Sequence, residues 1–223
     1  MIIVFSGLDG AGKSTQIEML RKRLSYAGCS SKILWARGGY TPCFELAKKL
    51  LRKITGKKLA PQGASEVREA QMSKPLVQKL WLFVAIADLI LFWAMYMRAL
   101  RMLGYFIICD RYIDDTLLDF RRNFPKSNFE RSILWRLLTY LIPSADVSFL
   151  FWVPVSVSQE RSLKKREPFP DDRETLEWRQ NAYMDKVIFS SENYLRIDGQ
   201  MPIDKIEEII SSNITLNLNT DNG

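Results

Sequence analysis

A glycine-rich run followed by a lysine and two hydroxyl residues stands near the start of the chain: Gly7-Leu8-Asp9-Gly10-Ala11-Gly12-Lys13-Ser14-Thr15. Its spacing is that of the phosphate-binding pattern G-x-x-x-x-G-K-[S/T]. Glycines let backbone N–H groups approach phosphate oxygens, and the positive end of a following helix attracts the same anion. Lys13 would reach the outer phosphates, and the Ser14 hydroxyl would bind Mg²⁺. The run predicts nucleoside triphosphate binding; a glycine turn that only joins two elements is the alternative.

A second group with chemical potential is Cys109-Asp110-Arg111-Tyr112, which closes an apolar run. In parallel α/β sheets the ligand crevice lies at the carboxyl ends of the strands, so Asp110 would point at the bound Mg²⁺. Arg111 could clamp a second phosphate with both of its terminal nitrogens. The alternative is an aspartate that caps a helix, with an arginine partner.

The elements that must position these groups alternate between strand and helix along the chain. Such alternation predicts an α/β fold with three layers, α/β/α, in which helices cover both faces of a central parallel sheet. The expected strands are Ile2–Phe5, Lys32–Trp35, Tyr105–Cys109, Val147–Val153 and Tyr194–Ile197. The expected helices cover 14–27, 43–54, 65–103, 114–123, 128–141, 156–167, 172–190 and 202–212, with a polar loop over 55–63.

Composition limits the possible chemistry. The chain has 223 residues and no histidine, which excludes histidine bases, Ser-His-Asp triads and histidine-containing metal sites. Its three cysteines are widely spaced and suggest neither a disulfide framework nor a zinc knuckle. We expect one domain over 1–215, followed by a frayed tail over 216–223.

The net charge of +7 arises from basic residues scattered through mixed-charge helices. A basic balance suits polyphosphate ligands, and without a basic stripe interleaved with aromatics we expect no nucleic-acid partner. Because the first strand begins at Met1, we expect no secretory leader and a cytoplasmic location.

The stretch 80–97 is almost entirely apolar and carries one charge, Asp88. Its length reaches that of a membrane span, although a mid-segment carboxylate would cost about 3 kcal/mol on insertion. We interpret it as a core helix of the α/β domain, with a dimer interface or membrane contact as alternatives.

Beyond the individual motifs, the sequence resembles thymidylate kinases, P-loop enzymes that phosphorylate dTMP. The resemblance rests on G-L-D-G-A-G-K-S-T-Q at the start and I-C-D-R-Y-I-D after the apolar strand, and it runs almost the full length. It implies that Asp9 approaches the acceptor sugar and that Arg37 lies in the family's Arg-Glu-Pro-Gly-Gly position. The resemblance also implies a P-loop kinase architecture with a mobile helical lid at about 155–178. The residues that match the lid are Arg161 and 164–166 followed by 172–174, and the family's last strand and helix would correspond to 194–199 and 203–212.

The needs of phosphoryl transfer assign roles to several of these residues. Lys13, with Mg²⁺ held by Ser14 and Asp110, would stabilise the leaving polyphosphate, and Arg111 would hold the acceptor phosphate. Position 11 is alanine, so by resemblance a lid residue, Arg166 or Arg173, would supply the catalytic arginine. The alternative for both lid arginines is an ion pair on the surface of a helix.

The acceptor side departs from the family pattern. The family's Asp-Arg pair on the long helix, whose arginine reads the base, appears here as Asp88-Leu89, and Phe83 is an aromatic that could stack on the base. Asp119 could accept a hydrogen bond from a ribose hydroxyl. The expected acceptor-binding residues are Asp9, Arg37, Phe83, Arg111, Tyr112, Asp115 and Asp119.

Together these features predict ATP-dependent transfer to a nucleoside monophosphate, dTMP to dTDP, by a homodimer that uses Mg²⁺ and makes no membrane contact. The alternatives are a kinase of a related small acceptor, such as a deoxynucleoside or another nucleotide, and a regulatory P-loop NTPase. The expected ATP-binding residues are Gly7, Asp9, Gly10, Ala11, Gly12, Lys13, Ser14 and Thr15.

Overall fold

The computed structural model describes residues 1–35, 41, 75–165, 171–185, 189 and 193–220. The chain forms two compact units. Unit 1 comprises Met1–Trp35, Leu100–Asp119 and Ser144–Gly223, and unit 2 comprises Ala36–Ala99 and Phe120–Pro143. The single domain over 1–215 stays a prediction.

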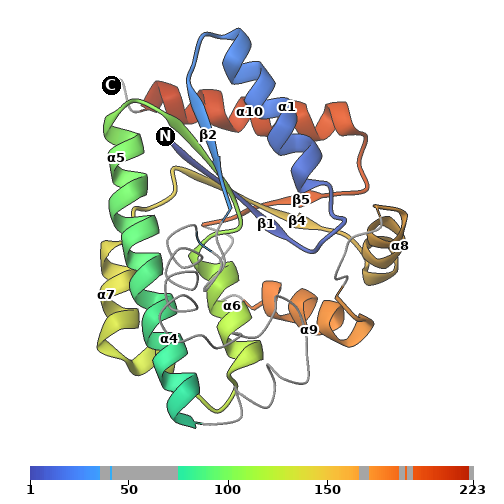
Figure 1. Cartoon of the computed structure of the whole chain (residues 1–223). Helices are drawn as coiled ribbons and strands as arrows, with labels where there is room; N and C mark the ends of the chain where they lie inside the picture. The colour runs from blue at the N-terminus through green and yellow to red at the C-terminus, as the bar shows by residue number, and fades with distance from the viewer. Residues whose placement is uncertain (36–40, 42–74, 166–170, 186–188, 190–192, 221–223) are drawn as a thin grey trace, which may run out of the picture. The chain divides into compact units, whose positions relative to one another are not determined.

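Unit 1 is built on a five-stranded parallel sheet (Figure 1). The strands are β1 (Ile2–Gly7), β2 (Ser31–Leu34), β3 (Phe106–Asp110), β4 (Val147–Trp152) and β5 (Leu195–Asp198). Their spatial order is β2-β3-β1-β4-β5, which puts the glycine-rich run after the central strand and Asp110 at the end of its neighbour. The predicted parallel α/β fold is confirmed, with each strand within two residues of its expected bounds.

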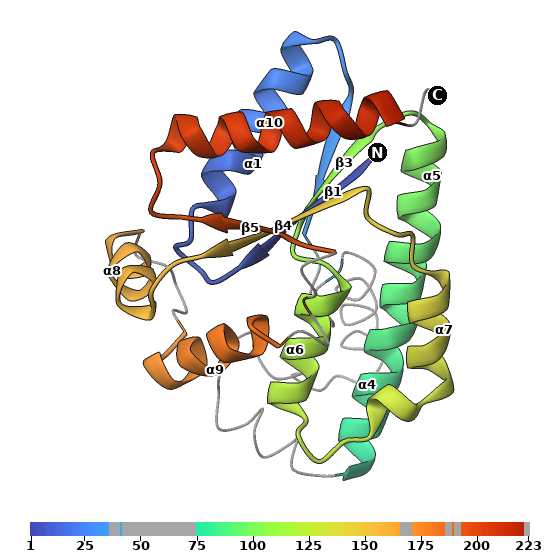
Figure 2. The same ribbon diagram turned by 180° about the vertical axis from the view of Figure 1, so that it is seen from behind.

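Helices lie on both faces of this sheet (Figures 1 and 2). On one face, α1 (Lys13–Tyr26) and α10 (Ile203–Thr220) cover the strands, and on the other lies α9 (Arg173–Tyr183). Between the sheet and the first pair, β4 contributes Phe149 and Phe151, while its alternate residues face the opposite way. The helix residues in this core are Ile17, Leu20, Leu24, Ile206, Ile210 and Ile214.

Unit 2 contains most of the long apolar helical stretch. It runs through α4 (Pro75–Leu89), a π-helical segment η1 (Ile90–Tyr96) and α5 (Met97–Met102), whose end passes into unit 1. Within unit 2, α4 and η1 pack against α7 (Ile133–Leu141). Five aromatic rings stack edge to face or tilted in this region: Trp81, Phe120, Phe124, Phe129 and Trp135.

By length and composition alone, one stretch of the described residues, Val77–Met102, could cross a membrane. Half of its most apolar window is buried. A core helix of a soluble protein has the same composition, so the stretch does not by itself indicate a membrane span.

Several predicted helix bounds are wrong, and one break has a clear local cause. The helix expected over 128–141 is instead a 3-10 turn η2 (Phe129–Arg131) followed by α7, because Ser132 is extended (φ −68°, ψ 147°). The Ser132 side chain caps the new helix by accepting from the Trp135 N–H at 3.2 Å. The helix expected over 172–190 ends at Tyr183, and α10 continues to Thr220, into the segment expected to be frayed.

Other helices follow their predictions closely. The segment α6 (Ile113–Asn123) begins in unit 1 and ends in unit 2, and α8 (Val155–Lys165) follows β4. The helix predicted over 43–54 and the loop over 55–63 lie outside the described residues.

The packing of α10 on the sheet can be tested with two isoleucines of that helix. Ile210 is buried in the core, whereas Ile203 is 54% exposed at the helix start. We expect Ile210→Ala to lower the free energy of unfolding by about 2–5 kcal/mol, because it leaves a cavity, and Ile203→Ala to cost under about 1 kcal/mol. Urea unfolding of both variants measures the difference, and equal losses would contradict this packing.

Candidate active site

The loop between β1 and α1 has the conformation that its glycines allow. Gly7, Gly10 and Gly12 have φ values of 132°, 72° and 100°, a region that other residues rarely adopt. Space is a second constraint: a Cβ on Gly7 would lie 2.3 Å from the Phe151 carbonyl oxygen, and one on Gly10 would lie 2.8 Å from the Ser158 carbonyl oxygen. The loop is therefore enclosed by β4 and α8, and Gly7 and Gly10 cannot be replaced without moving one of them.

Lys13, the first residue of α1, lies across this loop. Its buried ammonium donates to the carbonyl oxygens of Gly7 at 2.9 Å and Leu8 at 2.8 Å. Burial, with a smaller contribution from the nearby charge of Arg111, lowers the pKa of Lys13 to about 8. The amine is thus held by carbonyl oxygens at the place where phosphate oxygens are expected.

Arg111 follows β3 and is a buried cation with a strained backbone. Its φ is 75°, a positive value that residues other than glycine rarely adopt. One terminal nitrogen (Nη2) contacts Asp9 Oδ1 at 2.6 Å; the other (Nη1) donates to the Tyr183 hydroxyl at 3.1 Å and lies 3.5 Å from Asp115 Oδ1. Burial would lower the pKa of the Arg111 guanidinium, but Tyr183 and the carboxylates around it raise that pKa well above its ordinary value. The guanidinium is charged at every accessible pH.

Asp115, expected to contact the acceptor, is instead saturated by the protein. Its Oδ2 accepts from the Ser6 hydroxyl at 2.6 Å and the Tyr112 N–H at 3.1 Å, and its Oδ1 accepts from the Tyr183 hydroxyl at 2.7 Å. The side chain of Asp115 is almost fully buried, as is that of Tyr112. Asp115 therefore acts on Arg111 and Tyr183 rather than facing solvent.

Asp119, expected near a ribose hydroxyl, pairs with an arginine that the sequence did not single out. Arg179 on α9 lies 2.6 Å from Asp119 through Nη1 and donates through Nε to Asp171 at 2.9 Å. Burial opposes the charge of Arg179, yet the two carboxylates keep its pKa raised. Arg179 and its two carboxylates thus connect three parts of unit 1: α9 itself, Asp119 on α6, and Asp171 in the segment before α9.

Two residues of α8, Arg161 and Ser158, also hydrogen-bond to the loop, and their contacts with it were not predicted from the sequence. Arg161 donates from Nη1 to the carbonyl oxygens of Gly10 at 3.2 Å and Gly199 at 2.9 Å, and the Ser158 hydroxyl donates to the Asp9 carbonyl oxygen at 2.7 Å. Gly199 follows β5 and approaches the loop closely, since a Cβ there would lie 2.4 Å from the Ala11 carbonyl oxygen. The loop is tied to two other parts of unit 1.

The remaining predicted site residues are not all brought to this cluster. Arg173, at the start of α9, is 74% exposed and donates to Glu177 at 2.7 Å, the surface pair that was its alternative. Phe83 belongs to unit 2, where it is 56% exposed and lines a cavity of about 970 Å³ between α4 and the 125–134 segment. Arg37 and Arg166 lie outside the described residues.

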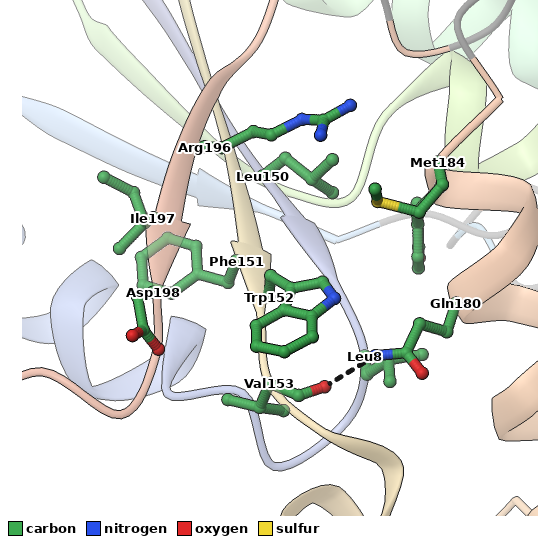
Figure 3. Close-up of a pocket in the computed structure, with 11 residues that line it drawn as sticks. Leu8, Leu150, Phe151, Trp152, Val153, Gln180, Met184, Arg196, Ile197 and Asp198 are labelled. Atoms are coloured by element: carbon green, nitrogen blue, oxygen red, sulfur yellow. Dashed lines mark hydrogen bonds between the residues drawn. The ribbon is translucent and has the colours of Figure 1, made fainter.

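A second cavity, of about 400 Å³, lies between the sheet and α9 in unit 1 (Figure 3). Its walls are mostly apolar, with Leu150 and Trp152 from β4 and Met184 beyond α9. Gln180 closes one side by donating from Nε2 to the Val153 carbonyl oxygen at 3.0 Å, drawn dashed in Figure 3. Leu8 of the loop and Tyr183 complete the lining nearest the cationic cluster.

Comparison with known proteins gives consistent matches. The family model described as thymidylate kinase matches residues 5–210. A thymidylate kinase of Nostoc sp. is 24% identical over 222 residues, covering 97% of this chain and 96% of that protein. One from Pseudomonas fluorescens is 26% identical over 215 residues, covering 95% and 93%, respectively. A thymidylate kinase of Pelodictyon phaeoclathratiforme is 32% identical over a shorter stretch of 116 residues, 52% of this chain and 45% of that protein.

The buried carboxyl of Asp114, next in sequence to Asp115, should make the stability of the protein depend on pH. Burial raises the pKa of Asp114 from 3.8 to about 6, against the hydrogen bond from Tyr194. Between those pH values the folded protein holds a proton that the unfolded chain releases, so the Asp114 contribution becomes more favourable as pH falls from 6 to 3.8. We therefore expect Asp114→Asn to be more stable than wild type at pH 7.5 and to lose that advantage towards pH 4.

The measurement is the urea midpoint of wild type and Asp114→Asn at several pH values. Asp204→Asn, at an exposed position on α10, is the control and should show no such trend. A difference between wild type and Asp114→Asn that does not change with pH would contradict the raised pKa.

Proposed function

The chain belongs to the thymidylate kinase family, and from that membership we propose that it transfers the γ-phosphoryl group of ATP to dTMP. An oxygen of the dTMP phosphate attacks the γ-phosphorus, the bond to the β-phosphate oxygen breaks, and dTDP and ADP leave. One observation carries the proposal: two buried cations lie close together, since Lys13 donates to the Gly7 carbonyl oxygen and the Tyr183 hydroxyl, 3.5 Å from that oxygen, accepts from Arg111. Asp9 is paired with Arg111. Two cations at the carboxyl edge of the sheet favour a ligand pair with two sets of phosphate oxygens.

Lys13 serves the donor side of this pair. When ATP enters the loop, its phosphate oxygens replace the Gly7 and Leu8 carbonyl oxygens as partners of the ammonium. A phosphate is a stronger partner for an ammonium than a neutral carbonyl, so the exchange favours binding. The charge of Lys13 then stabilises the negative charge that grows on the leaving ADP.

Arg111 serves the acceptor side. A dianionic phosphate of dTMP repels the γ-phosphate, and a guanidinium between them reduces that repulsion. Asp9 is bound to Arg111 at 2.6 Å and extends from the loop that holds ATP, so it connects the two sides and would approach the acceptor sugar. We assign Asp115 and Asp119 to holding Arg111 and Arg179, respectively, and not to acceptor contact.

Mg²⁺ would be held by Ser14 and Asp110 together with the phosphates. Hydroxyl and carboxylate oxygens are ligands that this ion prefers, Ser14 is exposed, and Asp110 ends β3 beside the loop strand. No cluster of three acidic, cysteine or histidine side chains occurs among the described residues, which fits an ion that shares its ligands with the nucleotide. When bound, the ion supplies charge neutralisation on the phosphates.

Phe83 and Arg37 complete the acceptor side in our proposal. Phe83 would stack on thymine, a contact that its exposed aromatic ring allows. Tyr112 follows Arg111 in the sequence and its ring is buried, so it would form part of the wall of the acceptor site. Arg37 would add a second contact to the acceptor phosphate.

The quaternary and cellular setting is also proposed. Leu80, Leu91 and Met95 are 63%, 52% and 63% exposed along the helix of unit 2. Apolar side chains at spacings of four and eleven residues share a helix face, and we propose that this face is covered in a homodimer. A cytoplasmic location fits a family whose substrates are free nucleotides.

The direct test is an ADP-release assay with Mg²⁺, ATP and separate acceptors. We expect turnover with dTMP, slower turnover with dUMP and none with thymidine. Lys13→Met should lower kcat at least about 100-fold, because the charge that stabilises the leaving group is lost, while Lys22→Met on the exposed face of α1 should leave it unchanged. ADP release that does not depend on a nucleoside monophosphate would exclude the proposed reaction.

The catalytic arginine of the lid can be found by two substitutions. We propose that either Arg166 or Arg173 closes over the transferring phosphoryl group. Alanine at the functional position should lower kcat about 1,000-fold, whereas at the other it should change kcat less than about threefold. Single-turnover rates with both variants measure this, and two near-normal rates would show that neither arginine is catalytic.

A further inference from the structure

The Tyr183 hydroxyl lies at the centre of the polar cluster around Arg111. Tyr183 is the last residue of α9, and its ring is almost fully buried. The hydroxyl accepts from Arg111 Nη1 at 3.1 Å and donates to Asp115 Oδ1 at 2.7 Å. It also lies 3.5 Å from the Gly7 carbonyl oxygen of the phosphate-binding loop. One hydroxyl thus contacts the arginine, its carboxylate and the edge of the loop.

The direction of these hydrogen bonds is fixed by chemistry. The guanidinium can only donate, and an ionised carboxylate can only accept, so the hydroxyl must accept from Arg111 and donate to Asp115. The direct Arg111 to Asp115 distance is 3.5 Å, longer than a good hydrogen bond. Tyr183 therefore bridges a gap that the ion pair leaves, and phenylalanine could neither accept nor donate here.

The ring of Tyr183 is held as firmly as its hydroxyl. It meets Phe189 edge to face with ring centroids 4.9 Å apart, and Phe189 in turn lies 4.9 Å from Tyr194. Tyr194 is also buried; its hydroxyl donates to Asp114 at 2.6 Å and also interacts with Ser6, which donates to Asp115. The row thus contains two buried tyrosines that differ in what their hydroxyls bind.

Arg111 needs such support because its backbone and side chain would otherwise be free to relax. A positive φ is unfavourable for a non-glycine residue, and a long side chain loses rotamer freedom when it is fixed. Asp9, in the glycine-rich loop, restrains one terminal nitrogen of Arg111. Tyr183, at the end of α9, restrains the other.

We propose that Tyr183 is a positioning residue for the acceptor phosphate: its hydroxyl bridges Arg111 to Asp115 and so fixes the plane in which the guanidinium meets that phosphate. The inference rests on the proposed role of Arg111 in acceptor binding. It adds a residue outside both sequence motifs, on the helix that follows the lid. In this proposal Tyr183 acts through Arg111.

The first test is a pair of matched substitutions, Tyr183→Phe and Tyr194→Phe. Each removes one buried hydroxyl that donates to a carboxylate and keeps the ring. We expect Tyr183→Phe to raise KM for dTMP about tenfold and KM for ATP less than about twofold, because only the acceptor arginine loses a hydrogen bond of the charge-assisted kind. Tyr194→Phe should leave both KM values within about twofold. If both variants change both KM values alike, the role of Tyr183 is only structural and the proposal fails.

The second test asks whether Tyr183 acts through Arg111. In an Arg111→Lys background, where the forked guanidinium is already lost, adding Tyr183→Phe should change KM for dTMP less than about twofold. An undiminished tenfold effect in that background would overturn the proposal. If Tyr183→Phe does not fold, Asp115→Asn weakens the same bridge and should raise KM for dTMP selectively; unchanged kinetics of that variant would refute the bridge.

Failure of the proposed function gives a different pattern. A wild-type protein and a Tyr194→Phe variant that both ignore dTMP would refute dTMP phosphorylation itself. Normal dTMP kinetics in wild type, Tyr194→Phe and Tyr183→Phe alike would refute only the role given to Tyr183.

Discussion

The ion pair between Arg111 and Asp9 is the interaction on which the rest of this site depends. Arg111 is a permanent cation placed among buried groups, where an uncompensated charge costs several kcal/mol. Asp9, Asp115 and Tyr183 reduce that cost from three different segments of unit 1. Buried pairs of this kind add little net stability, so their retention at a strained backbone position points to a requirement of function. A phosphate that reaches Arg111 would complete a site already built for negative charge.

The donor side is also built around a buried cation, Lys13, which loses its proton more easily than Arg111 does. Lys13 is buried and its pKa is lowered to about 8, so its charge is less secure than that of Arg111. Its partners in the structure are two carbonyl oxygens of its own loop, while Arg161 and Ser158 of α8 hold the other side of that loop. Contacts within the protein thus hold the shape of the loop. Preorganisation of this kind lowers the entropic cost of binding and keeps the two cations at a fixed separation.

The parts of this site that can be predicted from the sequence are those whose information is local. The phosphate-binding loop is nine residues of fixed spacing after a buried strand, and Asp110-Arg111 closes a second strand, so both are recognisable from neighbouring residues alone. Tyr183 and Arg179 are not, because their partners lie far away in sequence, at Asp115 and Asp119, and a helix of mixed polarity gives no sign of which residues turn inward. The protein contacts of these two aspartates could not be predicted for the same reason: an acidic residue near a motif is expected to face the ligand, whereas each has a buried protein partner.

Helix ends are the least predictable part of the fold. At Ser132, one extended residue with a capping side chain breaks a continuous apolar pattern, and the pattern itself carries no sign of that break. The strands β1, β3 and β4 differ, because each is a short apolar run between polar segments, and their bounds follow from composition.

The central claim is that Arg111 binds the phosphate of the acceptor, and calorimetric titration tests it most directly. dTMP and thymidine differ by that phosphate alone, so their affinities can be compared in wild type and Arg111→Lys without any turnover. The account predicts that Arg111→Lys weakens dTMP binding at least about tenfold and leaves thymidine binding unchanged, because lysine cannot offer the forked contact. Equal losses for both ligands, or no loss for dTMP, would contradict it.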